Sequence, residues 1–561
     1  MLEWLRDKTA AGRFGSKNIA VVLSAVLLSF FLLSCGGSGD GGDETTETVV
    51  FAPVVFMADN DTPGVIELYA SFDDGTNIVK LSGTLVAGGN VVDFRVSSDG
   101  IWVAYVADQD TNDVFELYVV PVDKTDSDDP VKISGDPMAG DGIKEKASGR
   151  YAFQWAPDTS RVAYLADQTT AGVVELYSNT PDGNSGTTIR LSVLFGTNRD
   201  VEDFAWSPDL DNHRRIAYLA DEQIVDVIEL YTTEPDNSFS IKINDGLGPG
   251  RNVTDFEWAP DASRIAFIAD KVVGVFELYT TFPTTTIDVL VSGSLAVTSD
   301  VLNFKWSPDS ARLAYLVLSA TPDFQLLTTL NSVLASTSIS SDIEDGEKSN
   351  YGWSWDSSLI AFIADEDFVD QFELYTSDPV DVSTKTQVSG NPVSGGDVKA
   401  FKWAPTELLI AYTADQDTNN KIELYTTNPP PSIEVEKVSG TPFAGDTVED
   451  DFKWSPDSSL IAYRADQDTL NQIELYSVEP DGSDNDKVSG TLPSGGDVDE
   501  FKWDDLGIAL GYLANQISVT VNELFASLPN GAENTRLSSN LVDSNGNPEA
   551  DGNVSAFEWV P

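Results

Sequence analysis

Short hydrophobic runs separated by turn-forming residues return along this chain about every 50 residues. The clearest copy spans residues 452–490. In this copy Phe452-Lys453-Trp454 alternates apolar and polar positions, and the further runs are Leu460-Ile461-Ala462-Tyr463, Ile473-Glu474-Leu475-Tyr476 and Lys487-Val488. Ser-Pro-Asp, Asp-Gln-Asp and Pro-Asp-Gly segments separate the runs, and such residues favour tight turns. The pattern therefore predicts four short β-strands in each copy.

Two of the predicted strands mark the copies. The third strand carries Glu-Leu-Tyr, which begins at Glu67, Glu116, Glu175, Glu229, Glu277, Glu373, Glu423 and Glu474, with Glu523-Leu524-Phe525 and Gln325-Leu326-Leu327 as variants. The first strand carries a tryptophan, which we place at Trp155, Trp206, Trp258, Trp306, Trp355, Trp403, Trp454, Trp503 and Trp559, with Val96 in the equivalent position. Both series give ten copies.

A single sheet of about 50 residues cannot bury both of its faces, whereas sheets packed around a ring can. We therefore predict an all-β protein, a β-propeller of about ten four-stranded antiparallel blades over residues 51–561. The first predicted strand of this region, Val54-Val55-Phe56-Met57, matches the second strand of the repeat. The last predicted strand, Phe557-Glu558-Trp559, matches the first strand of the repeat. These two strands are expected to complete one blade and close the ring.

Propellers typically have four to eight blades, so two smaller propellers are the alternative. Their boundary would lie near the degenerate sixth repeat, between Leu318 and Asn350. The turns that follow the tryptophans are short throughout, and this favours the single ring.

The order Trp-Ser-Pro-Asp, Ile-Ala-Tyr, Ala-Asp-Gln-Asp, Glu-Leu-Tyr and Pro-Asp-Gly resembles the TolB-type propeller repeat. The resemblance covers residues 51–561 and implies the propeller fold, with the tryptophan strand innermost in each blade. It implies little about activity, because propellers of this type serve as binding domains, scaffolds and lids of enzymes.

Residues 1–34 are predicted to be a lipoprotein signal peptide. A basic segment precedes an apolar run that is short for a membrane span, and the run ends at Ser34 before Cys35, the only cysteine of the chain. The Ser-Cys-Gly sequence resembles a bacterial lipoprotein cleavage box, so we expect Cys35 to carry the lipid. Residues 35–50 are then a flexible acidic tether that holds an extracytoplasmic propeller at the outer membrane or cell surface.

The formal net charge is −58. Nucleic-acid binding is excluded as a main role, because phosphate binding requires a basic surface. Contact with the membrane is expected only through the lipid, and a protein or peptide partner is expected to be basic. We expect a monomer whose stability depends on packing rather than on disulfides.

Acidic turns follow the second strand of several repeats and supply one candidate site. The pairs that we single out as possible metal ligands are Asp108 and Asp110, Asp415 and Asp417, and Asp466 and Asp468. Ca²⁺ prefers oxygen ligands, and the third-strand glutamate could join such a site. However, these loops lack the glycine and terminal glutamate of an EF-hand, so the alternative is a purely structural turn.

A second set of polar residues stands six positions before most first-strand tryptophans or their equivalents. It comprises Asn90, Asp200, Asn252, Asp300, Asp397, Asp497 and Asn553. These residues either cap the loop that enters the inner strand or form an acidic channel mouth that binds a cation or a Lys- or Arg-bearing ligand.

The sequence offers little enzyme chemistry. It has one histidine, His213, and lacks a Gly-x-Ser-x-Gly motif. The leading hypothesis is a non-enzymatic, lipid-anchored scaffold that binds a protein or peptide and has no cofactor. The alternatives are a Ca²⁺-dependent glycan-binding or adhesion module and a carboxylate-dependent glycan hydrolase or lyase.

Overall fold

A computed structural model describes most of the chain after residue 49, and Val50–Pro561 forms one compact unit. The described ranges are 50–62, 64–73, 75–125, 128–137, 142–183, 188–193, 196, 198–209, 215–236, 240–319, 324–333, 335–340, 343, 350–366, 371–440, 447–538 and 553–561. The predicted signal peptide, the predicted lipidation site Cys35, the predicted tether up to residue 49 and His213 lie outside them. Within these ranges no helix combines the length and apolarity needed to span a bilayer.

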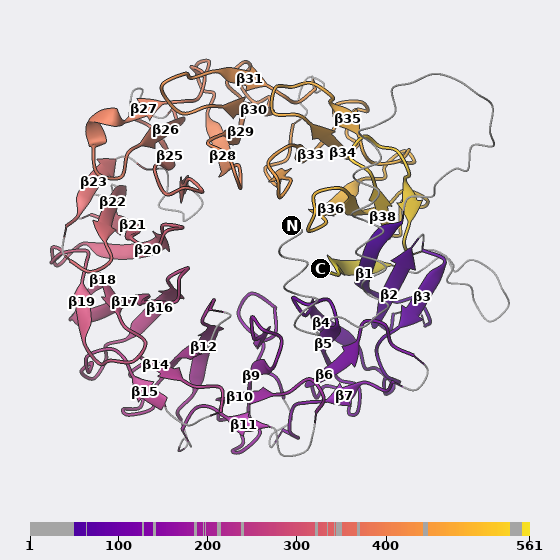
Figure 1. Cartoon of the computed structure of the whole chain (residues 1–561). Coiled ribbons are helices and arrows are strands. Elements are labelled where there is room, and N and C mark those ends of the chain that lie inside the picture. The colour runs from indigo at the N-terminus through magenta and orange to yellow at the C-terminus, as the bar shows by residue number, and fades with distance from the viewer. Residues whose placement is uncertain are drawn as a thin grey trace, which may run out of the picture. The chain divides into compact units, whose positions relative to one another are not determined.

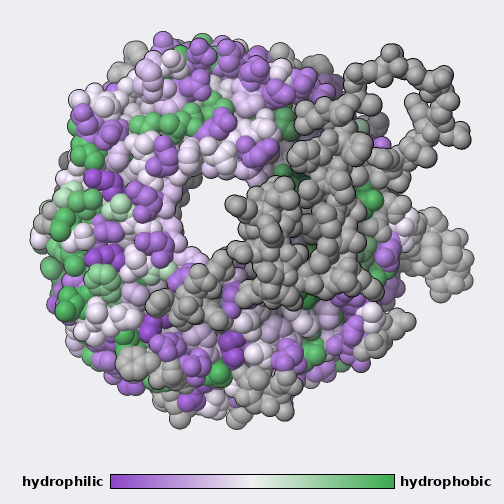
Figure 2. All heavy atoms as spheres, viewed as in Figure 1, coloured by the Kyte–Doolittle hydropathy of each residue, from purple (hydrophilic) through white to green (hydrophobic). Residues whose placement is uncertain are grey.

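Ten four-stranded antiparallel sheets form a ring of blades around an open centre (Figures 1 and 2). The prediction of an all-β propeller is thereby confirmed. Blade 1 has the order β40-β1-β2-β3, blade 2 has β4-β5-β6-β7, and the numbering continues in fours to blade 10, which has β36-β37-β38-β39.

The innermost strands, nine of which carry a tryptophan, surround the centre in Figure 1. They are β4 (Val91–Val96), β8 (Phe153–Trp155), β12 (Val201–Trp206), β16 (Val253–Trp258), β20 (Asp300–Trp306), β24 (Tyr351–Trp353), β28 (Val398–Trp403), β32 (Lys453–Trp454), β36 (Val498–Trp503) and β40 (Val554–Trp559). Several of them contain a β-bulge near their start, as between Val398 and Ala400.

The second and third strands form the buried middle of each blade, because most of their side chains lack solvent contact on both faces. The second strands are β1 (Phe51–Ala58), β5 (Trp102–Ala107), β9 (Val162–Ala166), β13 (Ile216–Ala220), β17 (Ile265–Val272), β21 (Arg312–Leu318), β25 (Ile360–Ala364), β29 (Ile410–Ala414), β33 (Ile461–Ala465) and β37 (Leu510–Ala514). The third strands are β2 (Glu67–Asp73), β6 (Glu116–Pro121), β10 (Glu175–Asn179), β14 (Glu229–Thr233), β18 (Val275–Thr281), β22 (Phe324–Leu330), β26 (Glu373–Ser377), β30 (Glu423–Thr427), β34 (Glu474–Val478) and β38 (Glu523–Ser527).

The fourth strands are short and lie on the outside of the ring (Figure 1). They are β3 (Asn77–Lys80), β7 (Val131–Lys132), β11 (Ile189–Arg190), β15 (Ser240–Lys242), β19 (Asp288–Leu290), β23 (Thr337–Ser340), β27 (Thr386–Gln387), β31 (Val435–Lys437), β35 (Asp486–Lys487) and β39 (Thr535–Arg536). A 3-10 turn, η2 (Val382–Thr384), precedes β27 in blade 7. Short outer strands limit the edge that could pair with other chains.

Aromatic residues of the second and third strands stack within the blades. Tyr463 and Tyr476 lie directly opposite each other, and their ring centroids are 5.5 Å apart. Equivalent stacked pairs occur in nine blades, with centroid distances from 5.3 to 5.8 Å. Blade 6 has Leu327 opposite Tyr315, so the degenerate repeat keeps the strand register while it loses the aromatic pair.

The tryptophans join neighbouring blades through their indole N–H groups. Trp454 Nε1 donates to the carbonyl oxygen of Lys402 at 3.1 Å, one blade back along the ring. The same bond is made by Trp155, Trp206, Trp258, Trp306, Trp353, Trp403, Trp503 and Trp559. At some seams a lysine makes a second contact in the opposite direction. Lys402 Nζ donates to Phe452 O in the next blade and lies 4.8 Å from the centroid of the Phe452 ring.

One assignment made from the sequence is wrong. We placed Trp355 in the inner strand of blade 7, but the structure places Trp353 there, bonded to Lys305 O at 3.3 Å. Trp355 lies in the following turn, at the position that proline occupies in Ser455-Pro456-Asp457, and it is 48% exposed. The sequence Trp353-Ser354-Trp355 offers two tryptophans, and only the register of the strand distinguishes them.

Strands from the two ends of the described region close the ring. Central β1 of blade 1 pairs with β40, and Phe56 lies opposite Phe557. This confirms the predicted closure. The alternative of two smaller propellers is wrong, because blade 6 is an ordinary blade whose seams continue on both sides through Trp306 and Trp353.

Candidate functional site

The first aspartate of each candidate metal pair is a buried turn residue. Asp108 Oδ1 accepts the backbone N–H of Asn90 at 2.6 Å, and its Oδ2 accepts that of Asp113 at 2.9 Å. Asp415 makes the equivalent bonds with Asp397 and Asn420, both at 2.7 Å. A carboxylate that caps two backbone donors satisfies groups that would otherwise be buried without partners.

The third pair follows the same arrangement. Asp466 Oδ1 accepts the backbone N–H of Thr447 at 3.1 Å. The second members of the pairs, Asp110, Asp417 and Asp468, are exposed. In each pair, therefore, the first aspartate is buried and the second is exposed to solvent.

A lysine ammonium lies between the carboxylates that we considered for Ca²⁺. Lys132 Nζ is 2.8 Å from Glu116 Oε1, 2.6 Å from Asp136 Oδ1 and 3.6 Å from Asp110 Oδ2. These four residues line a small cleft of about 270 Å³. Burial alone would lower the pKa of Lys132, but hydrogen bonds to Asp136 and Glu116 outweigh it and raise that pKa above its ordinary value. This lysine supplies the positive charge at this position.

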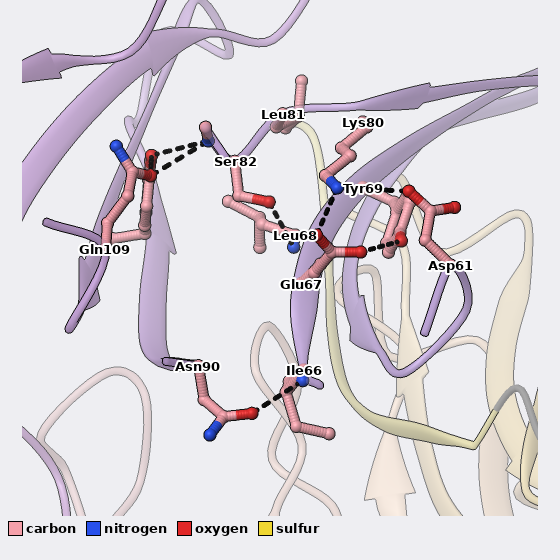
Figure 3. Close-up of polar contacts among 12 residues, drawn as sticks. Asp61, Ile66, Glu67, Leu68, Tyr69, Lys80, Leu81, Ser82, Asn90 and Gln109 are labelled. Atoms are coloured by element: carbon pink, nitrogen blue, oxygen red, sulfur yellow. Dashed lines mark hydrogen bonds and ion pairs between the residues drawn. The ribbon is translucent and has the colours of Figure 1, made fainter. Parts of the chain in front are cut away.

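Figure 3 shows the same arrangement in blade 1, where Lys80 points between Asp61 and Glu67. Tyr69 donates its hydroxyl proton to Glu67 Oε2 at 2.9 Å. Burial, and then the charge of Glu67, raise the pKa of Tyr69 far above its ordinary value, so this phenol stays protonated. Fourth-strand cations pair with the glutamate in other blades as well: Arg190, Lys242, Lys437, Lys487 and Arg536.

The fourth-strand cation is a residue that our sequence reasoning missed. A usable signal was present, because the lysine stands 13 to 16 residues after the Glu-Leu-Tyr glutamate in five blades. In several repeats it also precedes an apolar-Ser-Gly segment, such as Leu81-Ser82-Gly83. Among the residues that the structure describes, no group of three or more His, Cys, Asp or Glu side chains is arranged to hold a metal ion.

The predicted channel-mouth residues cap the preceding blade. Asn90 Oδ1 accepts the backbone N–H of Ile66 at 2.8 Å, at the entrance to β2 (Figure 3). The same bond is made by Asp200 to Val174, Asn252 to Ile228, Asp300 to Phe276, Asp397 to Phe372, Asp497 to Ile473 and Asn553 to Asn522. The structure thus brings these residues to the seams, each linking the loop before one inner strand to the third strand of the blade before it.

A cleft lies at the opposite mouth, where the inner strands of blades 9 and 10 lead into their turns. It measures about 810 Å³ and is lined by Lys453, Trp454, Pro456, Lys502, Trp503, Asp504 and Asp505. Sequence reasoning did not single out this site, because its residues belong to two repeats and have equivalents in other blades.

The two lysines of this cleft are held against its wall. Lys453 Nζ donates to Phe501 O, and Lys502 Nζ donates to Phe557 O. Burial lowers the pKa of Lys453. Burial also raises the pKa of Asp504, although its Oδ1 accepts the backbone N–H groups of Ile508 and Ala509. The cleft therefore combines apolar indole and proline surface with charges of both signs.

No family model matches this chain, and no curated protein matches it. Solved structures that resemble it include a eukaryotic initiation factor, with a TM-score of 0.47 and 10% identity over 91% of this chain and 98% of that one. A puromycin hydrolase has a TM-score of 0.34 and 13% identity over 68% of this chain, and a prolyl endopeptidase has 0.36 and 11% over 76%. This chain spans 62% and 56% of those two proteins.

Proposed function

We propose that this chain is a non-enzymatic, TolB-type propeller that binds a protein or peptide and is held at the bacterial envelope by a lipid on Cys35. The observation that carries the proposal is the cleft between blades 9 and 10. Its volume of about 810 Å³ and its two tryptophans, proline and charges of both signs suit a peptide segment. The rigid ring around it provides a preformed binding surface.

Support also comes from the candidate metal-binding carboxylates. Asp108 and Asp415 cap backbone donors, and Glu116 is paired with Lys132 and Tyr118. Groups that are engaged in this way stabilise the blades and are poorly placed to bind a substrate or Ca²⁺.

Photo-cross-linking in intact cells tests the proposal. A photoreactive amino acid at exposed Asp505, in the cleft, should yield a covalent adduct with a defined protein. The matched position is Asp468, an exposed aspartate in the turn between β33 and β34, at the opposite end of the blade. Adducts at Asp505 but not at Asp468 support a peptide-binding cleft. If neither position, nor any other exposed position scanned, captures a protein, the proposed function is wrong.

The anchor is tested separately. Cys35→Ser should release the protein from the membrane fraction or stall its processing, because the lipid can be attached only to the cysteine. Fractionation and intact-mass measurement report the result. A variant that stays membrane-bound with an unchanged mass would show that Cys35 carries no lipid.

A further inference from the structure

The loops between the third and fourth strands differ around the ring. In blades 5 to 8 they expose large apolar side chains, which we call the apolar arc. The arc comprises Phe282, Ile287, Val333, Val380, Val382 and Ile433, each between 40% and 71% exposed. Equivalent loops of blades 3, 9 and 10 contain instead the polar turns Pro181-Asp182-Gly183, Pro480-Asp481-Gly482 and Pro529-Asn530-Gly531.

The arc occupies one continuous sector of the rim. Figure 2 shows hydrophobic residues along the left and upper rim of the face it presents, where Figure 1 has β19, β23, β27 and β31. Third-strand threonines bond to the loops of the next blade: Thr280 Oγ1 donates to Asn331 O at 2.6 Å, and Thr328 Oγ1 donates to Pro379 O at 2.5 Å. The loops of blades 6 and 7 are therefore fixed against the blade before them, which makes this part of the arc a preformed surface.

The arc and the cleft lie on the same face of the ring. In an antiparallel four-stranded blade, the turn after the first strand and the loop after the third strand emerge at the same end. The turn of blade 7 adds the exposed Trp355 on this face, toward the centre. Exposed apolar side chains that gather on one face and are bordered by polar residues are typical of an interaction site.

The charges that border the arc are mainly acidic. Asp381 and Glu434 are exposed in its loops, and Asp378 is half-buried there. Of the nearby cations, Lys385 forms an ion pair with Glu366, and the guanidinium of Arg264 stacks over the ring of Phe282 at 4.0 Å. The border therefore favours a partner with Lys and Arg around an apolar centre.

We propose that the apolar arc is a docking surface for a folded protein or amphipathic segment whose apolar contact residues are flanked by Lys and Arg. The proposal rests on the proposed function, since it assigns the face that such a partner contacts. A net charge of −58 opposes docking of a second copy of this chain and opposes adsorption to anionic lipid.

The test uses the full chain and three synthetic peptides of equal length: alternating Leu and Lys, alternating Leu and Glu, and alternating Ser and Lys. Calorimetry should show that the Leu-Lys peptide binds, and that the other two bind at least roughly tenfold more weakly because each lacks one of the two features. Val333→Lys with Val380→Lys should weaken binding of the Leu-Lys peptide by a similar factor. Equal binding of all three peptides would overturn the proposal.

The matched controls are Val273→Lys and Val297→Lys. Both valines are more exposed than those of the arc, at 73% and 79%, and they lie in loops at the opposite end of the blades. This double variant carries the same added charge and should bind the Leu-Lys peptide as the native chain does. Equal losses in both double variants would show a general charge effect and overturn the proposal. Binding to neutral lipid vesicles, or self-association in sedimentation that Val333→Lys abolishes, would assign the arc to those occupants instead.

Failure of the arc proposal can be distinguished from failure of the proposed function. In the cellular cross-linking experiment, a photoreactive residue at Val333 should capture the same protein as one at Asp505. Capture at Asp505 alone would reject the arc and leave the proposed function intact. Absence of capture at every position would reject both.

Discussion

At the scale of the residue, neighbouring acids in this chain have different tasks. Asp415 caps the backbone N–H groups of Asp397 and Asn420, whereas Asp417, two positions later, is exposed. The third-strand Glu423 is paired with Lys437 and Lys421. Asp415 therefore stabilises its turn, and Glu423 forms ion pairs with two lysines.

This difference predicts unequal effects of two alanine substitutions. Asp415→Ala should destabilise the fold by about 1–3 kcal/mol, because it leaves two backbone donors without their acceptor. Asp417→Ala should change the stability by no more than about 0.5 kcal/mol. Thermal unfolding with and without Ca²⁺ measures both effects. A Ca²⁺-dependent rise in Tm that both substitutions abolish would instead establish the Ca²⁺ site considered from the sequence.

The aspartates in the turns after the inner strands predict that the stability of the fold decreases in acid. Burial would raise the pKa of Asp457, but hydrogen bonds from Ser455 and Ser459 outweigh it and lower that pKa below 3.8. The stability that Asp457 contributes is therefore complete above pH 3.8 and is lost as the pH falls through the lowered pKa.

Asp457→Asn should consequently be less stable than the native chain at neutral pH, and the difference should shrink in acid. Unfolding midpoints at neutral pH and near the lowered pKa check this. Asp356→Asn should behave in the same way. Burial would raise the pKa of Asp356, but hydrogen bonds from Ser358 and Ser354 outweigh it and lower that pKa. A difference that grows in acid would contradict the assignment.

At the scale of the element, each inner strand does two things. It pairs with the second strand of its own blade and, in every blade except blade 2, its tryptophan donates to the carbonyl of the preceding inner strand, as Trp403 does. The seams therefore depend on the register of strands as short as β24 (Tyr351–Trp353), because a shift of one residue turns the side chains to the other face.

Substitution of two tryptophans that lie two positions apart tests this register. Trp353→Phe should destabilise the fold by about 1–3 kcal/mol, because the carbonyl of Lys305 loses its buried donor. Trp355→Phe should be neutral within about 0.5 kcal/mol, because that side chain is exposed in the turn. Denaturant unfolding measures both. The reverse order would restore Trp355 to the inner strand, as the sequence had suggested.

At the scale of the whole molecule, β40 completes blade 1 and leaves no open edge between blades 1 and 10. Without β40, the inner edge of β1 would present unpaired backbone groups, and Trp559 could no longer donate to Lys502 O. Closure by strands from both ends of the described region therefore protects every blade, not only the first.

Deletion of residues 554–561 tests closure. The truncated chain should unfold at a lower temperature than the full chain and should self-associate through the exposed edge of β1. Calorimetry and light scattering check the two effects. A control that shortens the chain within residues 539–552, outside the described residues, keeps β40 itself intact. A truncated chain that stayed monomeric with the native Tm would contradict the role of β40.

The sequence by itself determined the class of fold, the number of blades and the strands that close the ring. These features follow from local periodicity: each strand has its own alternation, and each turn has its own Pro, Asp or Gly. Even the degenerate sixth repeat kept this periodicity, and β20 to β23 form a blade although Gln325-Leu326-Leu327 replaces the Glu-Leu-Tyr motif.

Only the tertiary structure decided which side chains meet. Lys132 lies among Glu116, Asp136 and Asp110, and Trp353 rather than Trp355 reaches the neighbouring blade. Such contacts join residues of different strands, often one repeat apart. The local sequence pattern does not specify how close two such residues lie in the folded protein. The cleft and the apolar arc arise in the same way, because each is assembled from loops of separate blades whose positions are set by ring closure.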